Sequence, residues 1–125
     1  MTPNELLHKA EQALKSAHLL CETGDPDGAC NRAYYAMFDA ARAALLSEGL
    51  DSGKTHKGLI NQFSERWVKS GRIEKDVGRF LKHAETVRYI ADYDGASIGL
   101  EDAKLIIDQA EVFVGVVSAI VTRAK

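Results

Sequence analysis

Arg88 occupies a position that calls for a chemical explanation. Between Val77 and Ala91 the apolar side chains recur at the spacing of one helix face, and at about 100° per residue Arg88 falls inside that face. Burying an unpaired guanidinium is costly, so either a carboxylate neutralises Arg88 or a cleft keeps it hydrated for an anionic ligand. Many arginines at the edge of an apolar face are merely structural, and both interpretations stay open.

A second organised group of polar side chains lies in residues 26–46. Apolar residues cover most of the circumference of this predicted helix, and the polar ones form a narrow arc: Asn31, Arg32, Tyr35, Asp39 and Arg42. The arc is narrower than a solvated face, which favours a cleft or a subunit interface. The alternative is a network of Tyr35, Asp39 and Arg42 that satisfies itself. In either case this helix should lie at the centre of a bundle.

Cap residues and apolar periodicity predict helices along the whole chain. Thr2, Pro3 and Glu5 mark the first helix start, and Asp25 with Pro26 marks the second. The predicted helices cover residues 3–23, 26–46, 58–68, 77–91 and 103–120, with connections at 50–57 and 92–99. No strand pattern is present. We therefore predict an all-α fold, an up-and-down bundle of four or five helices in one domain spanning residues 1–125.

Composition narrows the range of partners. A net charge of −2 and a pI near 6.1 exclude a nucleic-acid binder that works by bulk electrostatics, although a local basic patch is compatible with them. The sequence has no basic leader and no uninterrupted apolar run near the about 18 residues of a membrane span, so we expect a cytoplasmic protein without membrane contact. Cys21 and Cys30 are too few for a disulfide framework and should be buried free thiols.

The common catalytic motifs do not occur. The sequence holds no Gly-rich phosphate loop, nucleophile elbow or metalloprotease histidine pair, and its one Glu-x-x-His runs from Glu5 to His8. A carboxylate-bridged metal bundle needs that motif from two helices. We therefore expect neither a metal nor a cofactor.

Three sequence blocks resemble a known family. Residues 31–38 read Asn-Arg-Ala-Tyr-Tyr-Ala-Met-Phe, residues 55–60 read Thr-His-Lys-Gly-Leu-Ile, and residues 88–93 read Arg-Tyr-Ile-Ala-Asp-Tyr. In this order they resemble the HEPN superfamily, in its branch of small stand-alone bacterial and archaeal proteins, over nearly the whole chain. The resemblance implies a helical bundle that dimerises. It also implies a metal-independent ribonuclease, or a toxin paired with a minimal nucleotidyltransferase antitoxin.

The ribonuclease motif of that superfamily is an arginine separated from a histidine by four to six residues. Arg88 matches the arginine, but the histidine positions hold Tyr93, Asp94 and Gly95. In the implied mechanism the arginine stabilises phosphate charge and the histidine helps to move the proton of the ribose 2′-hydroxyl. The chain lacks that imidazole unless folding brings His56 to Arg88. In some relatives a tyrosine at the position of Tyr93 is adenylylated by the antitoxin.

Three functions are compatible with these residues. We favour a nucleotide- or RNA-binding protein, one component of a toxin–antitoxin-like pair with a minimal nucleotidyltransferase, in which Tyr93 acts through its hydroxyl. A weak metal-independent ribonuclease is the first alternative, and a non-catalytic dimerisation domain with Arg88 paired to Asp92 or Asp39 is the second. The candidate residues are Arg88, Asp92 and Tyr93 for catalysis and Arg32, Tyr35, His56 and Arg88 for binding. We further expect a homodimer, because a small bundle has little core with which to cover so apolar a helix as residues 26–46. We also expect a cleft that Arg88 shares with Arg32 or Tyr35.

Overall fold

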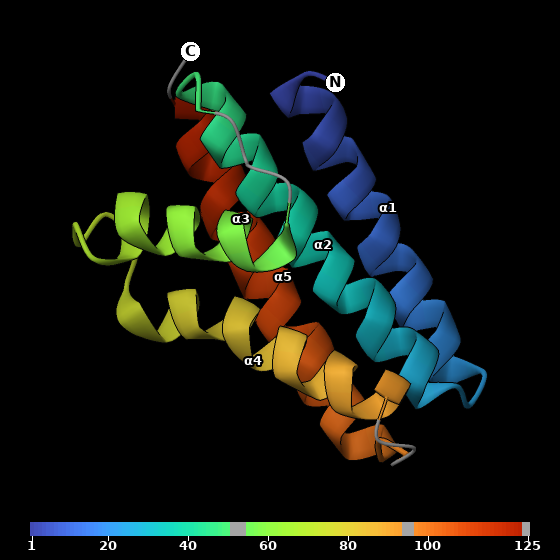
Figure 1. The fold of residues 1–125 in the computed structure, drawn as a ribbon. Coiled ribbons are helices and arrows are strands. Elements are labelled where there is room, and N and C mark those ends of the chain that lie inside the picture. Colours follow the sequence, from blue (N-terminus) through green and yellow to red (C-terminus); the bar gives the residue numbers. More distant parts are fainter. Residues whose placement is uncertain (51–54, 94–96, 124–125) are drawn as a thin grey trace.

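The computed structural model describes residues 1–50, 55–93 and 97–123, and the elements in this part of the chain are helical (Figure 1). In chain order they are α1 (Pro3–Glu22), α2 (Pro26–Ser47), α3 (His56–Phe63), the π-helical turn η1 (Ser64–Val68), α4 (Lys75–Tyr93) and α5 (Leu100–Arg123). No strand occurs among the described residues. The predicted all-α bundle is confirmed.

The first two helices begin and end where their capping residues predict. The hydroxyl of Thr2 accepts a hydrogen bond from the Glu5 amide, and the Glu5 carboxylate accepts one from the Thr2 amide, which completes a capping box. Asp25 caps α2 by accepting from the Gly28 amide. Beyond α2, Gly49 has φ of +73°, a left-handed conformation that glycine adopts without strain.

Helix α2 is the central helix. It packs against α1, α3, α4 and α5, while α3 and α4 run together as an arm that crosses the three long helices (Figure 1). Its row of small side chains is buried throughout: Ala29, Ala33, Ala36, Ala40 and Ala44. Methyl side chains let the neighbouring backbones approach closely, which explains why so many alanines occur in one helix.

The apolar surface of α2 is covered within one chain. Tyr34, Met37 and Leu45 are fully buried among the helices of the same bundle. We predicted a dimer because a small bundle should be unable to hide so apolar a helix, and this reason is wrong. Any dimer must use another surface.

We expected both cysteines to be buried free thiols. Both are free, and Cys30 is buried, which raises its pKa to about 12, whereas Cys21 is only half-buried.

Element boundaries in the arm differ from the predictions. The helix after the 50–57 connection begins already at His56, because Thr55 caps it by accepting from the Gly58 amide. Helix α4 continues through Asp92 and Tyr93, which we had placed in the connection. Asp92 pairs with Arg88 one turn earlier, and this i, i+4 contact helps to extend the helix. Positions 51–54 and 94–96 lie outside the described residues.

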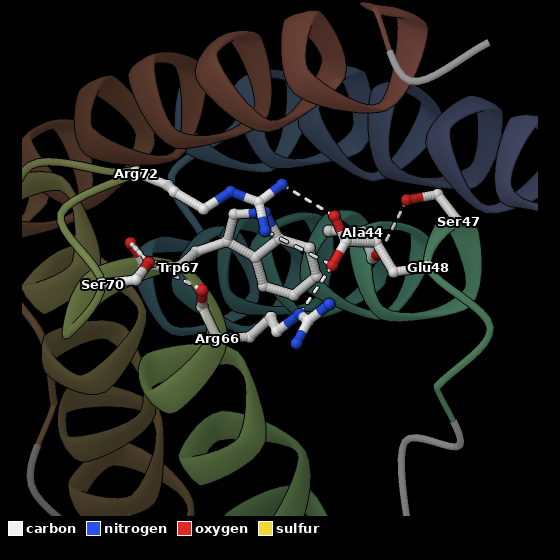
Figure 2. Close-up of polar contacts among 7 residues, drawn as sticks. All are labelled: Ala44, Ser47, Glu48, Arg66, Trp67, Ser70 and Arg72. Carbon is white, nitrogen blue, oxygen red and sulfur yellow. Dashed lines mark hydrogen bonds and ion pairs between the residues drawn. The ribbon is translucent and has the colours of Figure 1, made fainter.

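A polar cluster ties the arm to the end of α2. Arg72 and Arg66 each donate to the Glu48 carboxylate over 2.7 Å, and the Arg72 guanidinium lies over the Trp67 ring at 5.3 Å from its centroid (Figure 2). The Glu48 side chain is 18% exposed, whereas the two arginines are about half exposed. The hydrogen bonds from Arg72 and Arg66 lower the pKa of the Glu48 carboxyl to about 2. The cluster thus fixes the arm relative to the bundle.

Replacing Glu48 by glutamine should lower the free energy of unfolding by about 1–2 kcal/mol at neutral pH, because two charge-assisted hydrogen bonds weaken. The folded pKa lies below the ordinary value of 4.5, so the stabilisation is complete above that value and is lost as the pH falls toward about 2. Urea denaturation at pH 7 and at pH 3 measures this difference. The matched control is Glu65→Gln, whose exposed pair with Lys69 should matter little; equal losses in both variants would refute the role of Glu48.

Helix α5 contains an 18-residue stretch with a mean hydropathy of 1.8, so it is long and apolar enough to cross a membrane by length and composition alone. The apolar periodicity of the sequence did not indicate that α5 meets this criterion. Its buried residues pack on α1, α2 and α4: Ala103, Ile106, Ile107, Ala110, Phe113, Val114, Val117 and Val121. Of the apolar stretch 39% is buried in the bundle, so one face of α5 contributes to the core.

Candidate functional site

The Arg88 side chain lies against the aromatic residues of α2 and is 13% exposed. Its guanidinium carbon is 4.8 Å from the ring centroid of Tyr34 and 5.9 Å from that of Tyr35. Cation–π contacts stabilise a partly desolvated guanidinium by about 0.5–2 kcal/mol. The two tyrosines of α2 thus explain how a charged residue can occupy the apolar face of α4.

One carboxylate approaches Arg88 as well. Its Nη1 donates to Oδ2 of Asp92 over 3.1 Å, and the Asp92 side chain is 37% exposed. This bond uses one of the five N–H groups of the guanidinium. Among the described residues no acceptor bonds the buried Nε. The guanidinium is therefore only partly hydrogen-bonded, although burial makes unused donors costly.

His56 reaches the same place from the start of α3. Its Nδ1 lies 3.2 Å from the Tyr34 hydroxyl, in a hydrogen bond whose direction depends on the tautomer. Its ring centroid is 4.4 Å from that of Phe38 and 5.8 Å from that of Tyr35. The fold therefore brings an imidazole to the Tyr34 ring on which Arg88 rests.

The Tyr34 hydroxyl holds its proton firmly. Burial of the ring and, next, the nearby Glu85 carboxylate raise the pKa of Tyr34 well above its ordinary value. A neutral phenol can donate to Nδ1 of a neutral imidazole or accept from it when the ring is protonated. Tyr34 can therefore orient His56 in both protonation states, which is what a proton-transferring histidine needs from its partner.

Arg88 and His56 border a hollow of about 420 Å³ between the start of α3 and the second half of α4. We call it the Arg88 hollow; its lining is His56, Lys57, Glu85, Thr86, Arg88, Tyr89 and Ile90. Two fixed cations and an imidazole face one carboxylate there. Such a set of groups suits an anionic ligand of modest size.

Some of the residues proposed from the sequence lie at the Arg88 hollow, and the others lie away from it. Arg88 and His56 line the Arg88 hollow, with Asp92 hydrogen-bonded to Arg88. Tyr35 lies behind Arg88, and the Arg32 guanidinium lies 5.7 Å from the Tyr35 ring without lining the hollow. Tyr93 is 68% exposed in the last turn of α4, where its ring centroid is 4.8 Å from that of Tyr89. Of the two expected neighbours of Arg88, Arg32 does not line the hollow, whereas the Tyr35 ring centroid lies 5.9 Å from the Arg88 guanidinium.

Several residues that line the hollow or contact its lining were missed. Tyr34 was assigned to the core, and Lys57 and Glu85 were not considered. Glu85 precedes Arg88 by one helical turn, so the spacing could have indicated it. Lys57 could be found only by noticing that it follows His56. Tyr34 could not be predicted as a site residue from the sequence. Its side chain is fully buried like the rest of the core, and the hydrogen bond between its hydroxyl and His56 depends on the fold.

The polar arc of α2 does not form the internal network that we considered. No hydrogen bond joins Tyr35, Asp39 and Arg42, all of which are described. Asp39 is half-buried, and that burial raises its carboxyl pKa even though Lys9, Arg32 and Arg42 oppose the shift. The described residues also contain no group of three His, Cys, Asp or Glu side chains spaced to hold a metal ion.

Comparisons with known proteins agree in one family. The profile of the HEPN domain matches residues 3–120. A UPF0332 protein of Gloeobacter violaceus is 38% identical over 90% of this chain and 92% of its own length. A protein of Methanocaldococcus jannaschii named as a candidate toxin is 38% identical over 87% of this chain and 81% of its own, and a UPF0332 protein of Thermotoga maritima is 31% identical over 94% and 89%. The chain belongs to the HEPN domain family.

Proposed function

We propose that this HEPN protein binds the phosphate backbone of RNA, or a nucleotide, in the Arg88 hollow, and that it acts as the toxin-like component of a two-protein pair. The observation that carries the proposal is the guanidinium of Arg88, which is held on two tyrosine rings, borders a hollow and has an unbonded Nε. A group whose only task was to join two helices would be expected to use its donors within the protein.

A phosphate could replace or join Asp92 at Arg88. Asp92 is more than a third exposed, so its ion pair is screened by water and contributes little to stability. A phosphate oxygen can accept two N–H groups of one guanidinium, which a single-oxygen contact to Asp92 does not match. Lys57 adds positive charge on the α3 side of the hollow, His56 adds an imidazole there, and Glu85 lowers the net positive charge of the lining.

Fluorescence anisotropy with a labelled uridine oligonucleotide tests the proposed function. Purified protein at low salt should bind it with a dissociation constant in the micromolar range, and the affinity should fall as salt rises, because phosphate contacts release counterions. Absence of binding at low salt by a folded protein would contradict the proposal.

Metal-independent RNA cleavage is a second candidate, and the position of His56 supports it. The family motif lacks its histidine after Arg88, yet His56 lines the same hollow and hydrogen-bonds the Tyr34 hydroxyl. Cleavage would begin when His56 takes the proton of a 2′-hydroxyl. That oxygen attacks the adjacent phosphorus, the bond to the 5′-oxygen breaks, and the leaving oxygen takes a proton from water, to which His56 returns the proton that it had accepted. Arg88 would stabilise the charge on the phosphorus-bound oxygens.

The partner we favour is a minimal nucleotidyltransferase. Support comes from the family, from the relatives named as candidate toxins, and from Tyr93, whose exposed hydroxyl is within reach of a modifying enzyme. An adenylyl group on Tyr93 would add bulk and a negative phosphate next to Tyr89, which lines the Arg88 hollow. Modification would therefore weaken RNA binding by repulsion and by blocking access.

Tyr93→Phe should abolish adenylylation by the proposed nucleotidyltransferase partner, while it retains the contact with the Tyr89 ring. Stability should change by less than about 1 kcal/mol, because an exposed hydroxyl contributes at most one weak hydrogen bond. Mass spectrometry after incubation with the partner and ATP measures the modification. Tyr89→Phe is the matched control and should remain fully modified. The opposite pattern would move the modification to Tyr89.

A homodimer in the cytoplasm completes the proposal. Ile90, Leu105 and Val112 are 38%, 49% and 49% exposed on α4 and α5, and the first two border a hollow of about 300 Å³. Apolar side chains gathered on one surface favour contact with a second copy. Light scattering should give about twice the 13.7 kDa of one chain, and Leu105→Glu should halve that mass. A monomer at micromolar concentration would rule out this interface.

A further inference from the structure

A second hollow lies farther along the arm and is strongly basic. It measures about 270 Å³ and lies between η1 and the first half of α4; its lining includes Ser64, Lys69, Lys75, Arg79 and Lys82. We call it the basic hollow. It and the Arg88 hollow border consecutive parts of α4, and both lie on the side where α3 and η1 run beside that helix (Figure 1).

One face of α4 joins the two hollows. Lys75, Arg79, Lys82, Thr86, Tyr89 and Tyr93 follow one another at intervals of four and three residues. At this spacing side chains lie one above another on a single helix face. The first three border the basic hollow, and Thr86 and Tyr89 border the Arg88 hollow. The face therefore begins with cations and ends with two aromatic rings.

Positive charge is concentrated along this face. The two linings hold six of the chain's 16 Lys and Arg side chains and only one of its 18 Asp and Glu side chains. Lys69 pairs with Glu65 at 2.6 Å and Arg79 with Asp76 at 3.5 Å, but these four side chains are 66–82% exposed. Exposed pairs of this kind contribute little and exchange readily for a phosphate. This face of α4 is therefore cationic, although the net charge of the chain is negative.

The aromatic end of this face suits a nucleic acid base. Tyr89 and Tyr93 are 55% and 68% exposed, with ring centroids 4.8 Å apart. Large exposed aromatic rings next to cations are the arrangement on which single-stranded nucleic acids stack their bases. A duplex cannot use such rings, because its bases are already stacked inside the helix.

We propose that the α4 face from Lys75 to Tyr93 is a binding track for single-stranded RNA, with phosphates along the basic hollow and bases on Tyr89 and Tyr93. The inference rests on the proposed function, since it extends the ligand of the Arg88 hollow. The face spans the 19 residues of α4, and its two ends lie about 27 Å apart at the rise of an α-helix. That length suits a site of about four or more nucleotides.

The test compares a uridine dinucleotide with a uridine octamer as labelled probes. The wild-type protein should bind the octamer at least tenfold more tightly, because only the octamer reaches both hollows. In Lys75→Gln/Lys82→Gln this advantage should disappear, and the slope of log affinity against log salt should fall by about 1.4, the value for two lost phosphate contacts with a single strand. The charge-matched control, Lys15→Gln/Lys104→Gln, should keep both properties, because its changes lie on α1 and α5.

A second variant tests the aromatic end. Tyr89→Ala/Tyr93→Ala should weaken octamer binding about tenfold, in line with the loss of base stacking, and should leave the salt slope unchanged. An octamer of duplex RNA should bind more weakly than the single strand. Circular dichroism melts establish that each variant is folded before its affinity is compared.

The outcomes separate the track from the proposed function. If Arg88→Ala loses RNA while the double lysine variant retains the octamer advantage and the wild-type salt slope, the track is wrong and the Arg88 site stands. If the lysine and tyrosine variants lose RNA while Arg88→Ala does not, the track stands and the Arg88 site is wrong. If duplex RNA or vesicles of anionic lipid bind as tightly as the single strand, the surface is a general anion-binding patch and the proposal fails.

Discussion

Arg88→Ala should weaken the binding of single-stranded RNA by about tenfold to a hundredfold, which corresponds to about 1.4–2.8 kcal/mol and to the loss of charge-assisted hydrogen bonds to phosphate. The fold should survive. The variant gives up the contacts to Tyr34 and Asp92, but it also removes a cation that is only 13% exposed and only partly hydrogen-bonded. Because these contributions oppose each other, the free energy of unfolding should change by less than about 2 kcal/mol.

Two matched variants define what the arginine does. Arg88→Lys retains the positive charge but not the planar pair of donors, so it should recover part of the affinity. Arg32→Ala removes a guanidinium that touches the other tyrosine of α2 but does not line the Arg88 hollow, and it should change the affinity less than threefold. Equal losses in Arg32→Ala and Arg88→Ala would show that the general charge of α2 and α4 binds RNA, without a site at Arg88.

His56→Asn should lower any RNA cleavage by a factor of about 10²–10⁴, the usual contribution of a general acid or base. Binding should change much less, because Arg88 and Lys57 still hold the phosphate. Asparagine can retain a hydrogen bond to the Tyr34 hydroxyl, which limits the damage to the core. Gel analysis of a uridine oligonucleotide measures cleavage, and an oligomer with 2′-deoxy sugars should resist it because it lacks the attacking oxygen.

The matched control for His56 is His83→Asn. His83 is an exposed histidine on α4 that is hydrogen-bonded to Gln109 and does not line the Arg88 hollow. Its replacement should leave cleavage unchanged. Wild-type protein that binds RNA but does not cleave it would remove the ribonuclease candidate and leave the binding function, and cleavage that survives in His56→Asn would assign the proton transfer to another group.

Local chemistry made most of the fold predictable. Thr2 and Asp25 accept the hydrogen bonds that their positions before a proline indicated, and the alanine row of α2 is buried as its spacing implied. The end of α4 was predicted too early, because side-chain contacts determine whether the last turn is helical. Here Asp92 pairs with Arg88, and the Tyr93 ring lies against that of Tyr89. The π-helical turn at 64–68 was missed for a related reason, since helical periodicity does not distinguish it from an α-helix.

The candidate site was predictable only in part. Arg88 stood out because a charge in an apolar face violates the pattern of its own helix. His56 lies 32 residues earlier and borders the same hollow as Arg88 only because α3 packs on α2, a relation that no local spacing encodes. The cationic face of α4 was not predicted for a different reason. Its lysines and arginines are interspersed with Asp76 and Glu85 in the sequence, and the net charge of the whole chain is negative.

The measurement that tests the central claim most directly is a nuclear magnetic resonance titration of ¹⁵N-labelled protein with a uridine dinucleotide, observing the Arg88 Nε–H signal together with the backbone amides. If phosphate binds in the Arg88 hollow, the Nε–H signal should move together with the amides of His56, Lys57, Thr86 and Tyr89, all of which border it. In Arg88→Ala, which lacks the Nε–H group, the amide signals of His56, Lys57, Thr86 and Tyr89 should remain still. Shifts confined to α1 or to the exposed face of α5, with the Arg88 signal unchanged, would contradict the account.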